Sequence, residues 1–403
     1  YGMRECYENY HSVSISNDSL DQIVDLATRY LPDRYMPDKA LDLLDESCAY
    51  TAQDGLKEVT RERVAAVLQK RTGIPMSSIL RDRKQRISRI NDVIERRVIG
   101  QDKAVSEVSD SVAISFAGLQ DEKRPISSFL FLGTPGTGKT EMAKALSEAL
   151  FDDDNSMIRL DMSEFSEENS AQRLIGTNNK RGVLTEKVKH QPYSIVLLDE
   201  IEKGDRSVQD LFLQILSDGI VHDSYGRPVS FENTIVIMTT NLAGDVITDE
   251  NEYNSSADSD QKKLAFEKNV ENALSDYFRP EFINRIEHKV VFHMLSQVVV
   301  EKISKKYLSE LTNKLSKQGY SFTYDKLVPK FLADVGFSIS NGARPLAYMT
   351  HRKVTAPLAR IILQLERNGN VDITSFHARV VGKWPSKKDH DRFGTRKLVF
   401  DAS

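Results

Sequence analysis

Short apolar runs alternate with helical segments through the middle of the chain. The runs lie at 128–132, 157–160, 194–198, 234–238 and 290–292, and each has the length of a buried strand. Strands that alternate with helices pack as a parallel sheet with helices on both faces. We therefore predict an α/β fold with a doubly wound parallel sheet. In such a sheet, ligands bind at the carboxyl ends of the strands.

The two ends of the chain have a helical pattern instead. Apolar residues recur at helical spacing over 19–30, 37–46 and 59–68, and again over 297–315 and 328–335. We expect Asn17 or Ser19 to cap the first helix. Strand-like runs at 371–373, 378–381 and 397–400 close the chain, with Trp384 expected to pack rather than to bind.

These patterns predict four parts. They are a small helical domain at 1–54, a helical linker at 55–95, a large subdomain containing the sheet at 96–293, and a C-terminal subdomain with edge strands at 294–403.

The composition is that of an ordinary globular protein. The 403 residues are 40% hydrophobic and 28% charged, and the formal net charge of −4 gives no support to a nucleic-acid surface. No run reaches the about 18 apolar residues of a membrane span, and no signal peptide opens the chain. We therefore expect neither a membrane nor nucleic acid as a partner. Because the first residue is Tyr1, we expect the chain to be part of a longer protein.

The two cysteines, Cys6 and Cys48, lack metal-ligand spacing. We expect both to be small buried hydrophobic residues in a reducing compartment, the cytoplasm or another.

A phosphate-binding loop follows the apolar run at 128–132. The residues that fit G-x-x-x-x-G-K-[ST] are Gly133, Thr134, Pro135, Gly136, Thr137, Gly138, Lys139 and Thr140. A helix-forming run follows at once, so the loop amides and the helix dipole would bind a β-phosphate. Lys139 would reach the β- and γ-phosphates, and Thr140 would hold Mg²⁺. The alternative is a glycine-rich turn with a chance lysine.

Paired carboxylates end the apolar run at 194–198. Asp199 would complete the Mg²⁺ shell, and Glu200 would orient or deprotonate the attacking water. A buried strand can end in an acid by chance, but two adjacent acids downstream of a phosphate loop favour an ATPase.

Further motifs follow in the same order as in the Clp-type AAA+ unfoldases, which are double-ring ATPases, and the phrases at 279–285 and 342–346 resemble theirs. Residues 30–45 resemble the end of their first module, and 71–75 their inter-module linker. The resemblance implies ATP and Mg²⁺ as cofactors, with Val98 and Ile99 in the adenine pocket. It implies that Asn241 senses the γ-phosphate and that Arg285 is an arginine finger that reaches into the site of a neighbouring subunit. It also implies that Arg344 is the lid arginine, which contacts the γ-phosphate within the same subunit. A homo-hexamer that acts on protein substrates or adaptors is therefore expected.

The chain departs from this family in two loops. Relatives carry a Gly-aromatic-Val-Gly pore loop, whereas residues 174–184 are shortened and contain no aromatic residue. Tyr193 and Tyr225 lie elsewhere in the motif order and are not counted as replacements. Members that dock to the Clp peptidase carry a short tripeptide, aliphatic-Gly-aromatic or aliphatic-Gly-Leu, and none is found between Asn241 and Arg279. The similar tripeptide at 335–337 is expected to belong to the core of the lid. Docking to Clp peptidase is therefore not expected. The short interval between Ala49 and Thr60 leaves no room for a coiled-coil middle domain.

Two functions remain open on the sequence. The first is an ATP-driven module of a protein-remodelling machine, and the second is a nucleotide-gated scaffold that assembles the ring without pulling on substrate. Glu200, Arg285 and Arg344 favour the motor, whereas the shortened pore loop favours the scaffold.

Overall fold

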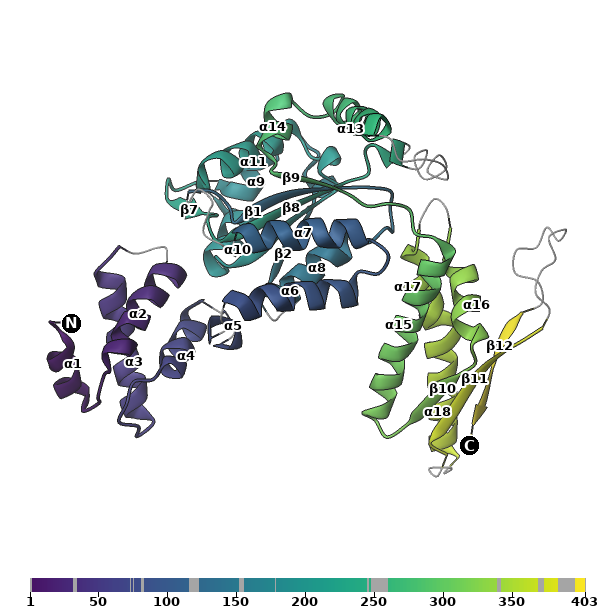
Figure 1. Cartoon of the computed structure of the whole chain (residues 1–403), viewed down its shortest axis with the longest axis horizontal. Coiled ribbons are helices and arrows are strands. Elements are labelled where there is room, and N and C mark those ends of the chain that lie inside the picture. The colour runs from purple at the N-terminus through teal and green to yellow at the C-terminus, as the bar shows by residue number, and fades with distance from the viewer. Residues whose placement is uncertain are drawn as a thin grey trace.

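The structure is a computed structural model of the whole chain. It describes residues 2–31, 35–72, 74, 76–80, 83–115, 123–151, 156–177, 179–244, 246–247, 260–338, 342–368, 373–382 and 396–402. Figure 1 shows a central sheet domain with a helical unit on its N-terminal side and a second small domain at the C-terminus. Among the helices that the structure describes, none has the length and apolar character of a membrane span.

Five helices form the described part of the N-terminal unit. They are α1 (Arg4–His11), α2 (Asn17–Tyr30), α3 (Asp38–Gln53), α4 (Arg61–Thr72) and α5 (Met76–Leu80). One buried cluster joins Leu43 of α3 to Leu68 of α4 and Ile79 of α5, so this packing unit extends beyond residue 54. The ring of Tyr30 lies 5.3 Å from that of Tyr193, which brings this unit against the sheet domain.

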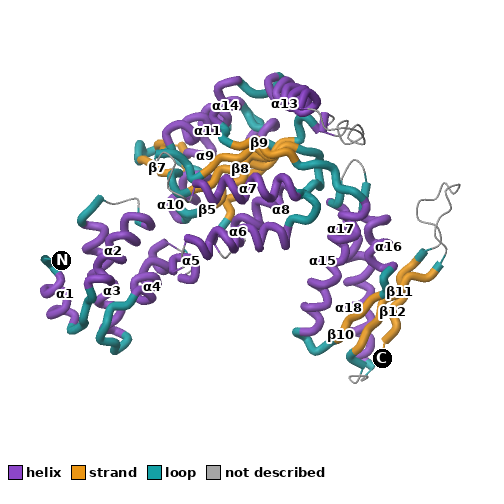
Figure 2. Tube along the Cα trace, viewed as in Figure 1, coloured by secondary structure: helices purple, strands orange, loops and turns teal. Residues whose placement is uncertain are grey.

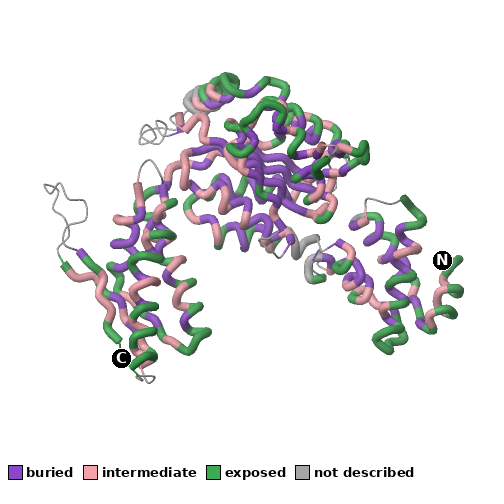
Figure 3. Tube along the Cα trace, turned by 180° about the vertical axis from the view of Figure 1, so that it is seen from behind, coloured by how far each residue is buried: buried purple, intermediate pink, exposed green. Residues whose placement is uncertain are grey.

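The central sheet has five parallel strands in the order β2-β5-β8-β1-β9. They are β1 (Ser127–Leu132), β2 (Met157–Asp161), β5 (Ser194–Asp199), β8 (Thr234–Thr240) and β9 (His288–Val291). Their side chains alternate between two cores: Phe129, Leu197 and Ile237 face one cluster, while Leu130 and Val196 face the other. Figure 3 shows that the middle of the sheet is buried, and every residue of β1 and β8 is buried, whereas the edge strands β2 and β9 are only partly so. A fully apolar strand is typical of a sheet covered on both faces.

Helices cover both faces of this sheet. The core around Phe129 receives α6 (Arg83–Arg97), α7 (Asp102–Ser115) and α8 (Lys139–Phe151). The opposite core receives α9 (Ala171–Ile175), α10 (Val183–His190), α11 (Arg206–Asp218), α13 (Asp260–Ser275) and α14 (Pro280–Arg285). Short 3₁₀ helices η1 (Met162–Phe165) and η2 (Ile201–Lys203) follow β2 and β5. Two small hairpins, β3 (Gly176–Thr177) with β4 (Lys180–Arg181) and β6 (Ile220–His222) with β7 (Pro228–Ser230), complete the domain.

Among its described residues, the C-terminal domain has four α-helices and a three-stranded sheet, and Figure 2 shows the helices packed beside the strands. The helices are α15 (Gln297–Ser316), α16 (Leu327–Gly336), α17 (Arg344–Thr350) and α18 (Ala356–Arg367), with the π-helical turn η3 (His351–Thr355) between the last two. The strands are β10 (Ser321–Tyr324), β11 (Ser375–Val381) and β12 (Lys397–Ala402), and the last two form an antiparallel hairpin. Residues 371–372 and Trp384 lie outside the described residues.

Three details correct the sequence predictions. Ser16 caps α2 by accepting a hydrogen bond from the amide of Ser19 at 3.0 Å, so the cap is neither Asn17 nor Ser19. Cys6 is exposed on α1 and only Cys48 is buried, because α1 presents the side of Cys6 to solvent. Strand β9 begins at His288, earlier than the apolar run at 290–292, because strand pairing with β1 continues through polar residues.

Candidate functional site

The predicted phosphate loop lies between β1 and α8. Gly133 has a φ of +153°, and a Cβ added there would lie 2.5 Å from the carbonyl oxygen of Phe292. Gly136 and Gly138 also have positive φ values, +75° and +111°. Side chains are strained in this region, so the glycines let the backbone turn sharply into α8. The free amides at the N-terminus of that helix favour an anion.

Most of the predicted site residues line one cavity of about 360 Å³. They are Val98, Ile99, Pro135, Gly136, Thr137, Gly138, Lys139, Thr140, Asp199, Glu200, Asn241 and Arg344. Gly133, Thr134 and Arg285 are outside its lining. The volume is within the range of small-molecule sites in proteins.

Lys139 lines this cavity and is 8% exposed. Its Nζ donates to the carbonyl oxygens of Gly133 at 2.5 Å and Thr134 at 3.1 Å, and to Oδ1 of Asn241 at 3.1 Å. Burial lowers the pKa of Lys139 to about 8, although three nearby carboxylates raise it. The ammonium is thus held among oxygen acceptors, the type of ligand that phosphate oxygens would replace.

The two acids at the end of β5 are oriented by one hydroxyl. Thr239 donates its hydroxyl to Oδ1 of Asp199 at 2.5 Å and accepts the amide N–H of Glu200 at 3.1 Å. Arg159 Nη2 donates to the other oxygen of Asp199 at 2.6 Å. Glu200 has a φ of +58°, and its carboxylate forms an ion pair with Lys203. Together with Thr140, the Asp199 oxygens are hard donors of the kind that Mg²⁺ prefers.

Asn241 connects the lysine to the second acid. It follows β8 directly; its Oδ1 accepts from Lys139, and its Nδ2 donates to Oε1 of Glu200 at 3.4 Å. Its backbone N–H donates to Glu202 at 3.1 Å. The Asn241 side chain therefore bridges the Lys139 ammonium and the Glu200 carboxylate.

The C-terminal domain approaches the phosphate loop through Gly342. The amide of Ala343 donates to the carbonyl oxygen of Gly136 at 3.2 Å. A Cβ on Gly342 would lie 2.8 Å from the same oxygen and 2.9 Å from that of Pro135. Arg344 is the first residue of α17, and its exposed side chain lines the cavity.

Apolar side chains line another part of the cavity. Val98 and Ile99 lie there with Leu295 and Ile303 of the C-terminal domain. Gln101, which is 3% exposed, fixes the 98–101 turn. Its Nε2 donates to the carbonyl oxygens of Thr137 at 3.0 Å and His293 at 2.8 Å, and its Oε1 accepts the amide of His293 at 3.1 Å.

An ionic network borders this apolar part. Arg97 at the end of α6 donates to Glu141 at 3.1 Å and to Glu148 at 2.6 Å, both on α8. Lys306 of α15 donates to the backbone oxygen of Arg97 at 3.0 Å and lies 3.5 Å from the Glu141 carboxylate. The network therefore joins the C-terminal domain to the helix that follows the phosphate loop.

Arg285 lies elsewhere. It ends α14, is exposed, and does not reach the cavity of its own chain. The role of Arg285 in the site of a neighbouring subunit stays a prediction.

The two loops that depart from the family pattern are only partly described. Residues 176–181 form the short hairpin β3–β4, with residue 178 outside the described part. Most of the acidic segment 244–262 also lies outside it. Val335 and Phe337 pack against the core of the C-terminal domain, as the sequence analysis expected.

Sequence reasoning did not single out several residues that orient this site. They are Arg97, Gln101, Arg159, Thr239, Lys203 and Lys306. A signal existed for Thr239, because it is close to the end of the strand that precedes Asn241, and a parallel neighbour brings that end beside Asp199. Arg97 and Lys306 gave no such signal, since they are far apart in the sequence.

Three family models match the chain. Residues 124–289 match the AAA domain (Cdc48 subfamily), 1–93 match an AAA lid domain, and 295–373 match the C-terminal D2-small domain of ClpB protein.

Curated relatives and solved structures agree with these matches. The chain is 34% identical to the ATP-dependent Clp protease ATP-binding subunit ClpC of Staphylococcus aureus, over 90% of the chain and 53% of the relative, and 33% identical to that of Staphylococcus epidermidis, over 93% and 54%. The chain thus spans about half the length of these relatives.

Among solved structures, the Saccharomyces cerevisiae Hsp104–ADP complex has a TM-score of 0.78 at 34% identity, over 94% of this chain and 65% of that one. The closed state of Hsp104 with ATPγS and FITC casein has a TM-score of 0.76 at 33% identity, over 99% and 66%. On its site residues, its three matched domains and these relatives, this chain belongs to the Clp-type AAA+ chaperone ATPases and corresponds to their C-terminal part.

Proposed function

We propose that this chain binds ATP with Mg²⁺ and hydrolyses it as the second ATPase module of a Clp-type protein-remodelling machine. The observation that carries this proposal is the convergence of Lys139, Asp199, Glu200 and Asn241 on one cavity. Phosphoryl transfer needs positioned charges more than covalent chemistry, and these groups are the required set. We also propose the four parts predicted from the sequence, at 1–54, 55–95, 96–293 and 294–403, with the last two enclosing the nucleotide. The buried cores divide the second part, because α4 and α5 pack with the first part and α6 packs with the third.

Each group has a defined task in this proposal. Lys139 would bind the β- and γ-phosphates, and Thr140 with Asp199 would hold the metal, which would neutralise developing charge on the phosphate oxygens. Glu200 orients the attacking water and accepts its proton, while Asn241 contacts both this carboxylate and Lys139. Val98 and Ile99 enclose the adenine. Arg344 contacts the γ-phosphate from the C-terminal domain.

The missing positive charge comes from a neighbouring subunit in a homo-hexamer. Arg285 is exposed and lies outside the cavity of its own chain, which supports a role in trans. An arginine finger supplied in trans contributes about 10³–10⁵ in rate. We place this activity in a reducing compartment, the cytoplasm or another, with protein substrates or adaptors as partners.

A pair of inactive variants tests the catalytic assignment and the trans arginine together. We expect Glu200→Gln to bind ATP but not to turn it over, and Arg285→Ala to lose turnover while rings still form. Mixing the two variants should restore activity, because a site with Glu200 from one subunit and Arg285 from the next is complete. At equal amounts, roughly a quarter of the sites would be complete in randomly mixed rings. No recovery on mixing, with mixed rings present, would show that Arg285 does not act in trans.

A second function is favoured by one observation, the short β3–β4 hairpin without an aromatic residue. In this alternative the module is a nucleotide-gated scaffold that assembles the ring without pulling. Unfolding of a tagged model substrate by the full-length protein separates the two functions. A motor loses unfolding in Glu200→Gln, whereas a scaffold retains it as long as ATP still assembles the ring.

A further inference from the structure

Two hairpins that are far apart in the sequence lie side by side. The loop 223–227 joins β6 to β7, and the amide of Ser224 donates to the carbonyl oxygen of Ile175 at 3.3 Å, just before β3. A Cβ added to Gly176 would lie 2.9 Å from the hydroxyl of Ser224. The 223–227 loop therefore packs against the base of the shortened β3–β4 hairpin.

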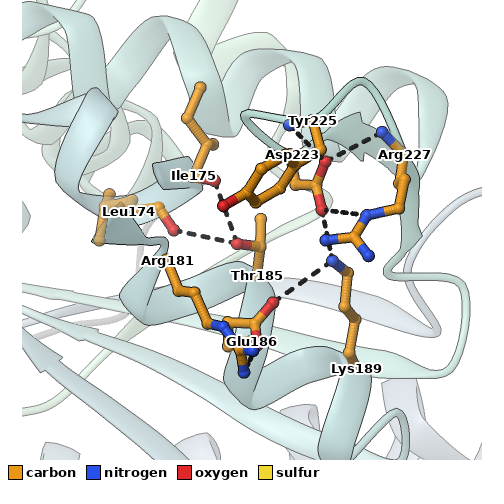
Figure 4. Close-up of polar contacts among 9 residues, drawn as sticks. All are labelled: Leu174, Ile175, Arg181, Thr185, Glu186, Lys189, Asp223, Tyr225 and Arg227. Atoms are coloured by element: carbon orange, nitrogen blue, oxygen red, sulfur yellow. Dashed lines mark hydrogen bonds and ion pairs between the residues drawn. The ribbon is translucent and has the colours of Figure 1, made fainter. Parts of the chain in front are cut away.

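Asp223 fixes the conformation of this loop. Its carboxylate is 3% exposed and accepts the backbone amides of Tyr225 at 2.8 Å and Arg227 at 2.9 Å. Lys189 of α10 donates to it at 2.5 Å, and the Arg227 Nε at 3.1 Å. Figure 4 shows these contacts meeting on the Asp223 side chain. Hydrogen bonds from Lys189 and the two amides hold the pKa of Asp223 well below its usual range, so the carboxylate remains charged.

The 223–227 loop, held by Asp223, exposes an aromatic ring to solvent. Tyr225 is 59% exposed, and the guanidinium of Arg227, itself 61% exposed, lies 4.9 Å from the centre of its ring. A tyrosine held in this way loses little conformational freedom on binding, and tyrosine and arginine are the residues that contribute most at protein interfaces.

The charge exposed around the ring is positive. Lys180 and Arg181 of β4 are exposed, as is Arg227. Two acids lie among these bases: Asp223 pairs with Lys189 and Arg227, and Glu186 pairs with Arg181 and Lys189. Four bases against two acids leave this cluster with a net charge of +2. A basic surface with an exposed aromatic ring complements an extended chain that carries acidic side chains.

We propose that Tyr225 and Arg227, with the exposed bases of β4, bind an extended acidic polypeptide segment. The inference rests on the proposed function, because that segment would belong to the protein substrate. It gives the module a substrate contact on a different loop from the one in which its relatives carry the pore aromatic. Tyr225 was not counted as a replacement for the pore aromatic because it lies elsewhere in the motif order. In the fold, however, its loop packs against the shortened β3–β4 hairpin.

Fluorescein-labelled casein, an acidic and largely unfolded protein, is a suitable probe. Anisotropy titrations with the 403-residue chain in the presence of ATPγS would compare wild type with Tyr225→Ala, Tyr225→Phe and Arg227→Glu. We expect Tyr225→Ala to weaken binding by about tenfold, equivalent to about 1.4 kcal/mol. Tyr225→Phe should retain most of the affinity, because it keeps the ring. Arg227→Glu should weaken binding most at low salt, because charge attraction is screened by salt.

The matched control is Tyr10→Ala, which removes an 81% exposed tyrosine from α1. Its casein affinity should equal that of wild type. The inference is overturned if wild type does not bind casein, if Tyr225→Ala binds as wild type does, or if Tyr10→Ala loses as much. It is also overturned if polylysine displaces casein as well as polyglutamate does, or if single-stranded RNA is the ligand whose binding depends on Tyr225.

ATP turnover without casein separates this inference from the proposed function. Tyr225 and Arg227 do not line the nucleotide cavity, so their variants should turn over ATP at the wild-type rate. Absence of turnover in the wild-type ring would refute the catalytic proposal even if casein still bound through Tyr225. Normal turnover with unchanged casein binding in Tyr225→Ala would refute only the substrate contact.

Discussion

The contact between Gly342 and the phosphate loop offers a sharp test of how the C-terminal domain controls nucleotide binding. Gly342 has a φ of +53°, and alanine there would place its Cβ 2.8 Å from the Gly136 oxygen and 2.9 Å from that of Pro135. Backbone atoms cannot move aside as a flexible side chain does. Gly342→Ala should therefore separate the two segments and break the hydrogen bond from Ala343 to Gly136.

The magnitude follows from a comparison with Gly319→Ala in the same domain. Gly319 has a φ of +86° and no heavy atom within 4 Å of an added Cβ. Both substitutions cost about 1–2 kcal/mol for a left-handed alanine. Only Gly342→Ala adds the lost hydrogen bond, about 1 kcal/mol, and a packing conflict of about 1–3 kcal/mol. The difference between the variants is at least about 2 kcal/mol, or about 30-fold in an equilibrium constant.

Calorimetric titration with Mg-ADP measures this difference directly. We expect Gly319→Ala to bind as wild type does and Gly342→Ala to bind about 30-fold more weakly, if closing of the C-terminal domain on the loop accompanies binding. Urea unfolding of both variants checks that they remain folded. Equal affinity of the two variants would show that the contact between Gly342 and the loop does not contribute to nucleotide binding.

Three further predictions concern ionisation and exposure. Because the pKa of Lys139 is lowered to about 8 and only its ammonium attracts phosphate, affinity for Mg-ADP should fall about tenfold per pH unit above that value. Lys139→Arg should give a flat profile from about pH 7 to about pH 9, since arginine stays charged, and a flat wild-type profile would contradict the assignment. Without nucleotide, Lys139 is protonated in the unfolded chain but largely neutral in the folded protein between about pH 8 and about pH 10.5. The free energy of unfolding should therefore rise with pH in this range. For the thiols, 5,5′-dithiobis(2-nitrobenzoate) should label Cys6 in the native protein but Cys48 only after unfolding, because burial raises the pKa of Cys48 to about 12; two thiols labelled at equal rates in native protein would contradict this.

The sequence predicted the strands of the central sheet well because central parallel strands are largely apolar, whereas it did not predict β10 or the short hairpins β3–β4 and β6–β7. The runs at 128–132 and 194–198 became β1 and β5 with shifts of one residue, and the motifs next to them fell at the carboxyl ends of the strands. Contacts between distant segments could not be read in the same way. Lys306 and the backbone of Arg97 are 209 positions apart, and neither lies in a motif with a recognisable spacing. The cap of α2 at Ser16 was missed because Asn17 and Ser19 are equally good capping residues by type, and only backbone geometry selects among them.

The C-terminal domain contacts the first helix and loop of the nucleotide site at two separate points. Gly342 and Ala343 lie against the backbone of the phosphate loop, whereas Lys306 of α15 lies against Glu141, one residue after Thr140. The cavity is lined by residues from both contacts, Ala343 at the first and Glu141 with Lys306 at the second. A rotation of the domain large enough to open the cavity must therefore break the Ala343 hydrogen bond, the Lys306 contacts, or both. Since each is worth only about 1 kcal/mol, the closed arrangement can be reversed by a ligand that distinguishes the two states by a few kcal/mol.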